Sequence, residues 1–208
     1  MEEKREEQEI DDAPIAFGDA LLATRDRRHG GCSTYPSPKN SPGALSPTMP
    51  FMDIRKPEAS EIDHLAQLWY DGWQDAHAQV VPAELKRLRT LQNFRERMRD
   101  ALPHTRVIGP PGGALGFCTI KADELYQLYV ASIARGTNVA AELIDDGEAR
   151  LRGFGVKTAW LSVAIGNERA IRFYEKQGWR RIGKMTNLLD TIEGEFELVT
   201  WRFEKDLQ

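Results

Sequence analysis

The stretch RGTNVA, from Arg135 to Ala140, decides how the rest of the sequence is interpreted. It follows the apolar run ELYQLYVA and leads directly into AELIDDGEARL, whose apolar spacing is typical of a helix. We expect this helix to begin at about Arg135. The first amides of a helix lack intrahelical partners and lie at the positive end of its dipole, so this position suits a phosphate group. Gly136 and Ala140 leave room for a ligand to approach the backbone, and Arg135 adds a positive charge. An ordinary turn is the alternative for this stretch taken by itself.

A second stretch, NERAIRFYEKQGW, covers residues 167–179 and also predicts a helix, with Gly178 as a left-handed stop. Ala170 and Tyr174 lie four residues apart and therefore share one helix face, which leaves a groove with a hydroxyl group at its edge. A tyrosine, with a pKa near ~10, can give its proton to a departing thiolate. The structural alternative places Tyr174 in the core and makes Asn167 an N-cap.

Around these two stretches the sequence predicts one ordered region that begins near Phe51. A first helix starts at the capping-box-like Ser60-Glu-Ile-Asp63, and a second runs from Pro82 until Pro103 stops it. Strands are predicted at FMDIRK, TRVIG, ALGFCTIK, ELYQLYVA, KTAWLSVAI, WRRIGKMTNLLD and GEFELVTWRFEK. The resulting order, β-α-α-β-β-β-α-β-α-β-β, indicates a mixed α/β fold with one sheet and helices on both faces. Strands joined by short turns should be antiparallel, and the strand–helix–strand unit at 124–164 should contain a parallel pair.

Residues 1–50 differ in composition from the remainder of the 208-residue chain. They are acidic at the start and then rich in Ser and Pro, so they cannot bury enough apolar surface to offset the entropy of ordering. We therefore expect a disordered tail at 1–50 and a folded domain at 51–208. The tail is either a regulated segment with Ser-Pro sites or a passive extension, and an alternative start at Met49 or Met52 stays open.

Charge and composition narrow the possible partners and location. Residues 1–12 hold seven acids and two bases, which leaves 26 bases and 25 acids in the remainder of the chain. The remainder is therefore close to neutral, and its net charge does not favour nucleic acid as a partner. No apolar run approaches the ~20 residues of a membrane span, and no secretory signal is present. The two cysteines cannot form a framework of disulfides, and Cys118 in GFCTI is predicted to be a core residue. We expect a cytoplasmic protein with no metal site, and a homodimer stays open.

Together, the two stretches closely resemble the GNAT N-acetyltransferase superfamily. Its acetyl-coenzyme A signature, Arg/Gln-x-x-Gly-x-Gly/Ala, is matched by RGTNVA, except that Asn138 replaces the glycine. Its later motif is matched by Asn167, Ala170, Phe173-Tyr174 and Gly178-Trp179. The resemblance covers about residues 51–205. It implies a GNAT-like, mostly antiparallel central sheet with one parallel, splayed strand pair.

The resemblance implies transfer of an acetyl group from acetyl-CoA to a primary amine, by direct attack through a tetrahedral intermediate. The cosubstrate's pantetheine arm would lie between strands 124–131 and 157–164, and Tyr174 would protonate the leaving thiolate. Residues implied in cosubstrate binding are Leu128, Tyr129, Val130, Arg135, Gly136, Thr137, Asn138, Val139, Ala140, Ala141, Asn167, Ala170 and Tyr174. Because asparagine tolerates a left-handed backbone, Asn138 could preserve the loop while its side chain crowds the phosphates. We therefore expect a working site with weakened affinity.

The reaction also needs a base, because an amine must lose a proton. In family members that use a glutamate base, that residue lies at the position of Glu124, so the resemblance makes Glu124 the candidate; a plain turn carboxylate is the alternative. For the acceptor, a small-molecule or peptide amine, the helical spacing places Tyr70, Trp73 and His77 on one face, where an aromatic wall could hold a cation. The alternative for this face is core packing.

Two other classes of function are alternatives to the enzyme. A non-catalytic acyl-CoA-binding regulatory module on the same fold is the main alternative, and the Asn138 substitution favours it. A dinucleotide-binding domain is rejected, because the G-x-G-x-x-G fingerprint is absent and the predicted strand order is wrong for it.

Overall fold

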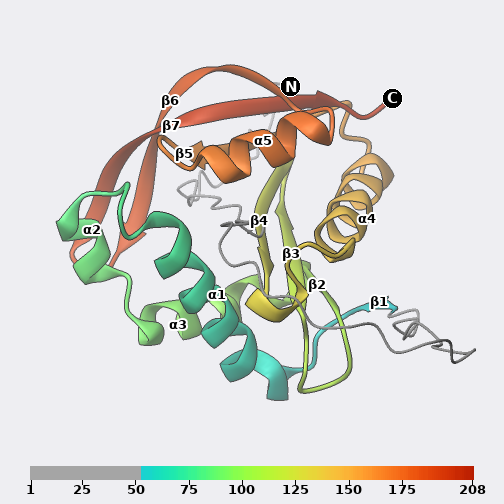
Figure 1. Ribbon diagram of the computed structural model, residues 1–208, viewed down its shortest axis with the longest axis horizontal. Coiled ribbons are helices and arrows are strands. Elements are labelled where there is room, and N and C mark those ends of the chain that lie inside the picture. Colours follow the sequence, from blue (N-terminus) through green and yellow to red (C-terminus); the bar gives the residue numbers. More distant parts are fainter. Residues whose placement is uncertain (1–52) are drawn as a thin grey trace, which may run out of the picture.

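A computed structural model describes residues 53–208 (Figure 1). The predicted tail at 1–50 and the predicted strand residues Phe51 and Met52 lie outside this range. The strands are β1 (Ile54–Arg55), β2 (Thr105–Ile108), β3 (Gly116–Lys121), β4 (Glu124–Val130), β5 (Thr158–Ala164), β6 (Arg180–Thr191) and β7 (Gly194–Asp206). The α-helices are α1 (Ile62–His77), α2 (Ala83–Leu88), α3 (Leu91–Ala101), α4 (Val139–Gly153) and α5 (Glu168–Lys176). Short 3₁₀ turns precede α1, β2 and the loop before α4.

The strands form one seven-stranded sheet in the order β1-β2-β3-β4-β5-β7-β6. Every neighbouring pair is antiparallel except β4 and β5, which are parallel. The predicted fold class is therefore confirmed, including the single parallel pair. That pair is made by the strand–helix–strand unit β4–α4–β5, since a parallel neighbour requires a crossover connection.

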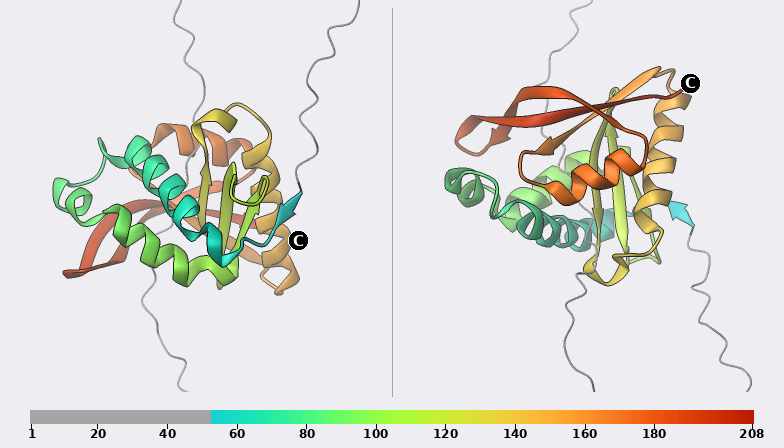
Figure 2. Two further views of the ribbon diagram at one scale, coloured as in Figure 1. Left: turned by 90° about the horizontal axis from the view of Figure 1, so that it is seen from below. Right: turned by 45° about the horizontal axis from the view of Figure 1, so that its top comes forward.

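Helices pack on both faces of the sheet, as predicted (Figure 2). Helices α4 and α5 contribute to one hydrophobic cluster, and α1, α2 and α3 contribute to the other. Cys118 lies in the first cluster, fully buried, and this burial raises the pKa of its thiol to about 12. The prediction that Cys118 is a core residue is confirmed. None of the helices within 53–208 is both long and apolar enough to cross a membrane.

The second predicted helix, from Pro82 to Leu102, is in fact two helices, α2 and α3. Arg89 ends α2 with a ψ of 72°, and Thr90 has an extended backbone and accepts a hydrogen bond from the amide of Asn93 at 3.2 Å. This N-cap starts a new helix at Leu91. The apolar residues keep helical spacing across Thr90, so the sequence pattern predicts one continuous helix.

The first predicted helix also starts differently from the prediction. Glu58 and Glu61, rather than Ser60 and Asp63, form the reciprocal pattern, with the Glu58 amide donating to Glu61 Oε2 at 2.9 Å. A 3₁₀ turn follows at Ala59–Glu61, and α1 begins at Ile62.

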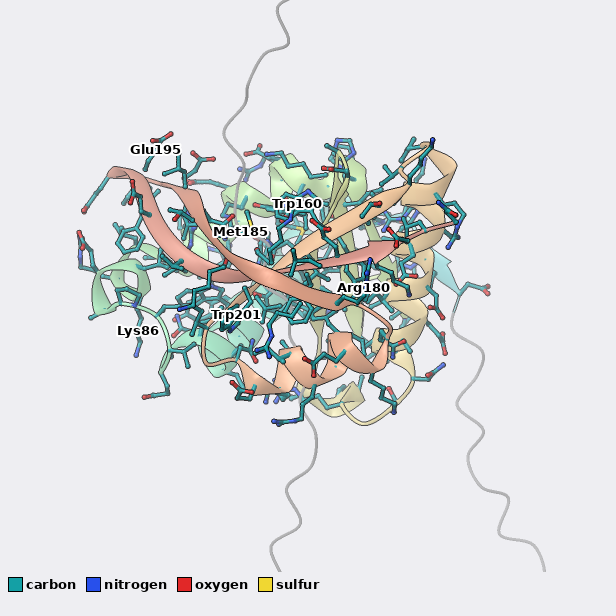
Figure 3. The ribbon with its side chains drawn as sticks, turned by 90° about the horizontal axis from the view of Figure 1, so that it is seen from above. Lys86, Trp160, Arg180, Met185, Glu195 and Trp201 are labelled. Atoms are coloured by element: carbon teal, nitrogen blue, oxygen red, sulfur yellow. The ribbon has the colours of Figure 1, made fainter. Side chains whose placement is uncertain are left out.

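Strands β6 and β7 form a long hairpin that extends beyond the rest of the sheet (Figure 3). Figure 3 labels Glu195 near its tip and Trp201 farther along β7. The guanidinium carbon of Arg181 and the Nζ of Lys184 lie 4.9 and 5.4 Å from the Trp201 ring centre. These cation–π contacts cover the indole where the hairpin is exposed.

Glu61 joins the start of α1 to β1 and to the β2–β3 turn. Its carboxylate accepts two hydrogen bonds from Arg55, at 2.7 and 2.8 Å, and one from the Gly112 amide at 2.9 Å. The hydrogen bonds from Arg55, chiefly, lower the pKa of Glu61 from 4.5 to about 2. The ion pair therefore stabilises the fold fully above pH 4.5, and this contribution is lost as the pH falls toward 2.

We expect Glu61→Gln to lower the free energy of unfolding at pH 7 by about 2 kcal/mol, because it leaves Arg55 without its charged partner. The difference from wild type should shrink between pH 4.5 and pH 2, where Glu61 becomes protonated. Urea unfolding at pH 7 and pH 3 measures both effects. Glu193→Gln is the matched control, since the Arg87–Glu193 pair is exposed on both sides and should matter less. An equal loss at both pH values would contradict the assignment.

Candidate functional site

Strand β4 carries a bulge in the middle of the sheet. Thr119 of β3 pairs with Gln127, and the next β3 residue, Ile120, pairs with Leu125, so Tyr126 is an extra residue. The bulge sends Tyr126 to the α1–α3 side of the sheet and returns Leu128 to the α4 side. Bulges bend a strand and interrupt pairing, and they are common beside active sites.

Strands β4 and β5 diverge after a single point of pairing. Their only register pair within 53–208 joins Glu124 to Trp160. Trp160 anchors this closed end, because its amide donates to Asp123 O at 3.2 Å and its Nε1 to Asp123 Oδ1 at 2.9 Å. Beyond it, the two strands leave a gap that opens toward the loop before α4.

The backbone of β4 presents hydrogen-bonding groups to this gap. The Ala131 amide donates to Leu115 O at 2.7 Å, on the β3 side. Successive residues of a strand direct their backbone groups to opposite edges, so Leu128 and Val130 direct theirs toward β5. Tyr129 directs its backbone toward Phe117 of β3, and its ring packs on that of Phe117 at 5.6 Å. Of the three predicted backbone contacts, the geometry therefore favours Leu128 and Val130.

Buried polar side chains come from both strands of the gap. Glu124 begins β4 and is 2% exposed, so it is not a solvated turn carboxylate. Gln127 of β4 and Ser162 of β5 are also buried. Gln127 and Ser162 were not predicted as site residues, although a polar residue inside an apolar strand, as in LYQLY and WLSVA, is a usable signal.

The loop from Arg135 to Asn138 precedes α4, which begins at Val139 rather than at the predicted Arg135. Gly136 has a φ of +77°, and a Cβ added there would meet open space, so backbone conformation is what favours glycine. Thr137 Oγ1 donates to Ala134 O at 2.6 Å and accepts from the Val139 amide at 3.3 Å. In the first backbone hydrogen bond of α4, the Glu142 amide donates to Asn138 O at 3.0 Å. The preceding amides, of Ala140 and Ala141, are those that a helix leaves for a ligand.

Asn138 has a φ of −82°, an ordinary right-handed conformation. The tolerance of asparagine for left-handed backbone is therefore not needed at this position, and asparagine fits without strain. Its side chain is exposed, and its Nδ2 donates to Glu142 Oε1 at 3.3 Å. The side chain therefore lies beside the first turn of α4.

Arg135 is held by an acidic residue of α1. Its Nη2 lies 3.0 Å from Asp75 Oδ2, and the Nη2 of Arg169 in α5 lies 2.9 Å from the same oxygen. The predicted loop cation is thus tied to α1 and α5. Arg169 was not identified from the sequence, because residues 75 and 169 come together only in the fold.

The second stretch forms α5 as predicted. Asn167 is its N-cap, with Oδ1 accepting from the Ala170 amide at 3.2 Å, which is the structural alternative stated for this residue. Tyr174 is fully buried, and its ring packs on Trp179 at 6.2 Å and Phe203 at 6.3 Å. Ala170 is buried one turn before it.

A pocket of about 400 Å³ joins the loop to α5. One wall is the loop and the first turn of α4, and the other is the polar face of α5. The lining residues are Gly136, Thr137, Asn138, Ala140, Ala141, Arg169, Arg172, Phe173, Lys176 and Gln177. The structure thus brings the loop residues of the first stretch and α5 of the second into one cavity.

The predicted aromatic wall on α1 is not a shared surface. Trp73 and His77 are fully buried and stack on each other at 5.5 Å, so the core interpretation applies to them. Tyr70 is half-buried and lines a pocket of about 490 Å³ with residues of α2. Of the three, Tyr70 alone lines this pocket.

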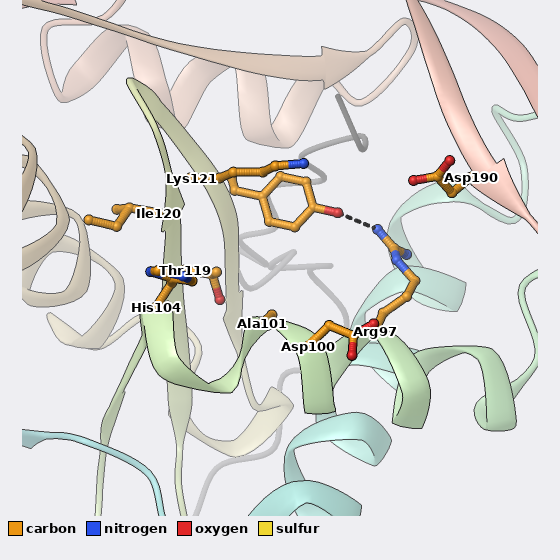
Figure 4. Close-up of a pocket in the computed structure, with 9 residues that line it drawn as sticks. Arg97, Asp100, Ala101, His104, Thr119, Ile120, Lys121 and Asp190 are labelled. Carbon is orange, nitrogen blue, oxygen red and sulfur yellow. Dashed lines mark hydrogen bonds between the residues drawn. The ribbon is translucent and has the colours of Figure 1, made fainter. Parts of the chain in front are cut away.

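Another pocket, of about 350 Å³, lies on the α3 side of β3 and β4 (Figure 4). Its lining includes Tyr126, the extra residue of the β4 bulge, and Arg97, whose Nη2 donates to Tyr126 Oη at 3.1 Å. The Arg97 guanidinium also lies 4.4 Å above the Trp69 ring, so two contacts fix its position. Asp190 of β6 and Lys121 of β3 line the same pocket. Both acidic and basic groups therefore face it.

A family model described as the Acetyltransferase (GNAT) family matches residues 62–179, which include β4, the loop, α4, β5 and α5. The chain belongs to this family. Members of the family use acetyl-CoA as cosubstrate, and the GNAT resemblance drawn from the two stretches is confirmed. Two features of the structure suit a long thioester with a phosphorylated end. They are the splayed parallel pair β4–β5 and the basic pocket at the start of α4.

Two solved structures share the GNAT fold. A GCN5-related N-acetyltransferase of Rhodopseudomonas palustris has a TM-score of 0.60 and 19% identity, over 74% of this chain and 95% of the other. The PaiA N-acetyltransferase of Thermoplasma acidophilum, in complex with coenzyme A, has a TM-score of 0.55 and 18% identity, over 74% and 98%. Among curated proteins, mycothiol acetyltransferase of Parafrankia sp. (strain EAN1pec) is 36% identical over 84 residues, which is 40% of this chain and a quarter (25%) of that relative.

Proposed function

We propose that this GNAT chain is an N-acetyltransferase that moves an acetyl group from acetyl-CoA to a primary amine. The observation that carries the proposal is the gap between β4 and β5, which pair only at Glu124–Trp160 and lead into the pocket at the loop. Acetyl-CoA supplies the acetyl group as an activated thioester. Leu128 and Val130 would bind its pantetheine arm and polarise the carbonyl, and the amides of 136–141 would hold its pyrophosphate.

Glu124 and Tyr174 would manage the two protons of the reaction. Glu124 would accept the proton of the attacking amine at a carboxylate oxygen, and Tyr174 would give its hydroxyl proton to the departing thiolate. Glu124 starts the strand that carries Leu128, four residues and about 13 Å away by strand geometry, so bound water would relay the first proton. Asn167 would support the arm through its cap at the start of α5.

The acceptor would approach from the α3 side of β4, through the pocket in Figure 4. By strand alternation Glu124 and Tyr126 share this side of β4, so the pocket lies on the same side as the proposed base. Arg97 and Asp190 give the pocket groups of both signs, which suits a polar amine. The surface around Tyr70 is a second, less direct candidate, because it lies beyond α1 from β4.

Calorimetry with acetyl-CoA, followed by a screen that monitors release of the coenzyme A thiol, tests the function. The amine panel covers polyamines, aminoglycosides, amino acids and peptide N-termini. Binding together with thiol release supports the enzyme. Binding without release from any amine favours the regulatory module, and absence of binding excludes both.

We expect Asn138→Gly to tighten acetyl-CoA binding by about threefold, because it removes a side chain that lies beside the first turn of α4. Glycine is accepted at an N-cap, so the helix should keep its stability. Calorimetric Kd values for the two proteins measure the effect. Weaker binding by the variant would mean that the asparagine amide is itself a ligand.

A further inference from the structure

The pocket of about 350 Å³ on the α3 side of β3 and β4 holds its charged groups at two depths. Arg97 of α3 and Lys121 of β3 are half-buried, whereas Asp100, His104 and Asp190 are exposed. Charges that are partly removed from water act more strongly on a ligand than exposed charges do, because water and salt screen the exposed ones. Positive charge therefore dominates the inner part of this pocket.

The two cations lie around the side chain of Tyr126, the extra residue of the β4 bulge. Arg97 Nη2 donates to Tyr126 Oη at 3.1 Å, and Lys121 Nζ lies 6.0 Å from the centre of the Tyr126 ring (Figure 4). The rings of Trp69 and Phe94 hold the Arg97 guanidinium in place, with its carbon 4.4 and 5.6 Å from their centres. A guanidinium fixed in this way is a preorganised planar donor, and this geometry matches a carboxylate.

We propose that Arg97, Lys121 and the Tyr126 hydroxyl bind a carboxylate of the acceptor, so that the preferred acceptor is an amine that carries a carboxylate. The inference rests on the proposed function, because it assigns the class of acceptor at the same site. The Tyr126 hydroxyl can donate its hydrogen to the carboxylate while it accepts from Arg97. An amine without a carboxylate has to place a neutral or positive end beside two cations.

The position of Tyr126 on β4 sets the length of the acceptor. Leu128, whose backbone is proposed to polarise the thioester carbonyl, lies two residues after Tyr126, about 7 Å along the strand. The amine must reach this carbonyl while the carboxylate stays at the Tyr126 hydroxyl. We therefore expect a chain of several bonds between the two groups, as in 5-aminopentanoate, rather than the single carbon that separates them in glycine.

Amines of equal length isolate the charge at the far end of the acceptor. 5-Aminopentanoate, 5-aminopentanamide and 1,5-diaminopentane end in a negative, a neutral and a positive group. Steady-state kinetics of the full chain with saturating acetyl-CoA measure kcat/KM for each amine. Wild type should use the carboxylate amine about tenfold more efficiently than the amide, since two or three partly exposed charge contacts each contribute modestly. The diamine should be poorer than the amide, because its far ammonium group meets Arg97 and Lys121.

Variants of the pocket assign this preference to its residues. Lys121→Gln should reduce the carboxylate-to-amide ratio to about threefold, and the loss should lie in KM for the carboxylate amine. Arg97→Lys keeps a positive charge but loses the planar fork, so it should also reduce the ratio. Asp190→Asn removes a negative charge from the rim and should leave the ratio unchanged or raise it. Lys157→Gln, at an exposed position outside the pocket, is the matched control and should retain the wild-type ratio.

Equal use of the carboxylate amine and the amide by wild type overturns the inference, and so does a preference for the diamine. Both results leave the proposed function intact, because acetyl transfer still occurs. A loss of the ratio in Lys157→Gln as well would assign the effect to overall charge and also overturn the inference. Absence of turnover with all of these amines overturns it too, and the proposed function is then decided by acetyl-CoA binding and the wider amine panel.

Discussion

Replacing Glu124 by glutamine should lower kcat/KM for the acceptor by about 10² to 10³-fold, the range of a lost general base. Glutamine keeps the shape and hydrogen-bonding capacity of the buried side chain but cannot take a proton from the amine. The wild-type rate should fall at acidic pH as the carboxylate becomes protonated. The variant should lack this acidic limb, since it has no carboxylate at this position.

The pH–rate profile and the Kd for acetyl-CoA together separate a base from a structural role. The affinity for acetyl-CoA should change less than about threefold, because Glu124 lies at the closed end of the gap, away from the loop. Glu197→Gln, a change at an exposed position of β7, is the control and should leave the profile unaltered. An unchanged pH dependence in Glu124→Gln would remove this residue from the mechanism.

Tyr174→Phe should lower kcat by about 100-fold, because the departing thiolate loses its proton donor. Its ring packs between Trp179 and Phe203, and phenylalanine preserves these contacts. Affinity for coenzyme A and the melting temperature should therefore stay near wild type. Steady-state kinetics with acetyl-CoA, together with thermal unfolding, measure these effects.

A donor with a better leaving group sharpens this test. An acetyl thioester of a coenzyme A analogue with a more acidic thiol needs less help from a proton donor, so it should recover most of the lost rate in Tyr174→Phe. Wild type should gain little from the same donor. A variant with normal kcat and a lower melting temperature would show instead that Tyr174 serves the core alone.

The sequence predicted the fold class and the approximate position of each strand because the apolar periodicities are strong. It located the loop and α5 because their short motifs are local. It did not predict the division between α2 and α3, where Thr90 caps a helix inside an unbroken apolar pattern. The start of α4 was placed four residues early, because a 3₁₀ turn at Ser132–Ala134 and the loop precede it.

The less predictable parts of the site depend on contacts between distant residues. The bulge at Tyr126 changes which side chains face each helix layer, and it is visible only through the pairing of β4 with β3. Arg135 and Arg169 meet at Asp75, which belongs to a helix far earlier in the chain. The burial of Trp73 likewise depends on α3 and the sheet, since helical spacing alone shows a shared face but not what covers it.

The place of β7 in the sheet has a consequence for how the protein is made. Strand β7 lies between β5 and β6, although both precede it in the chain. During synthesis, β5 can therefore pair only at Glu124–Trp160 until residues 194–206 have left the ribosome. The half of the sheet on the β5 side of the gap should thus form late, and nascent chains arrested before β7 should expose β5 to chaperones and proteases.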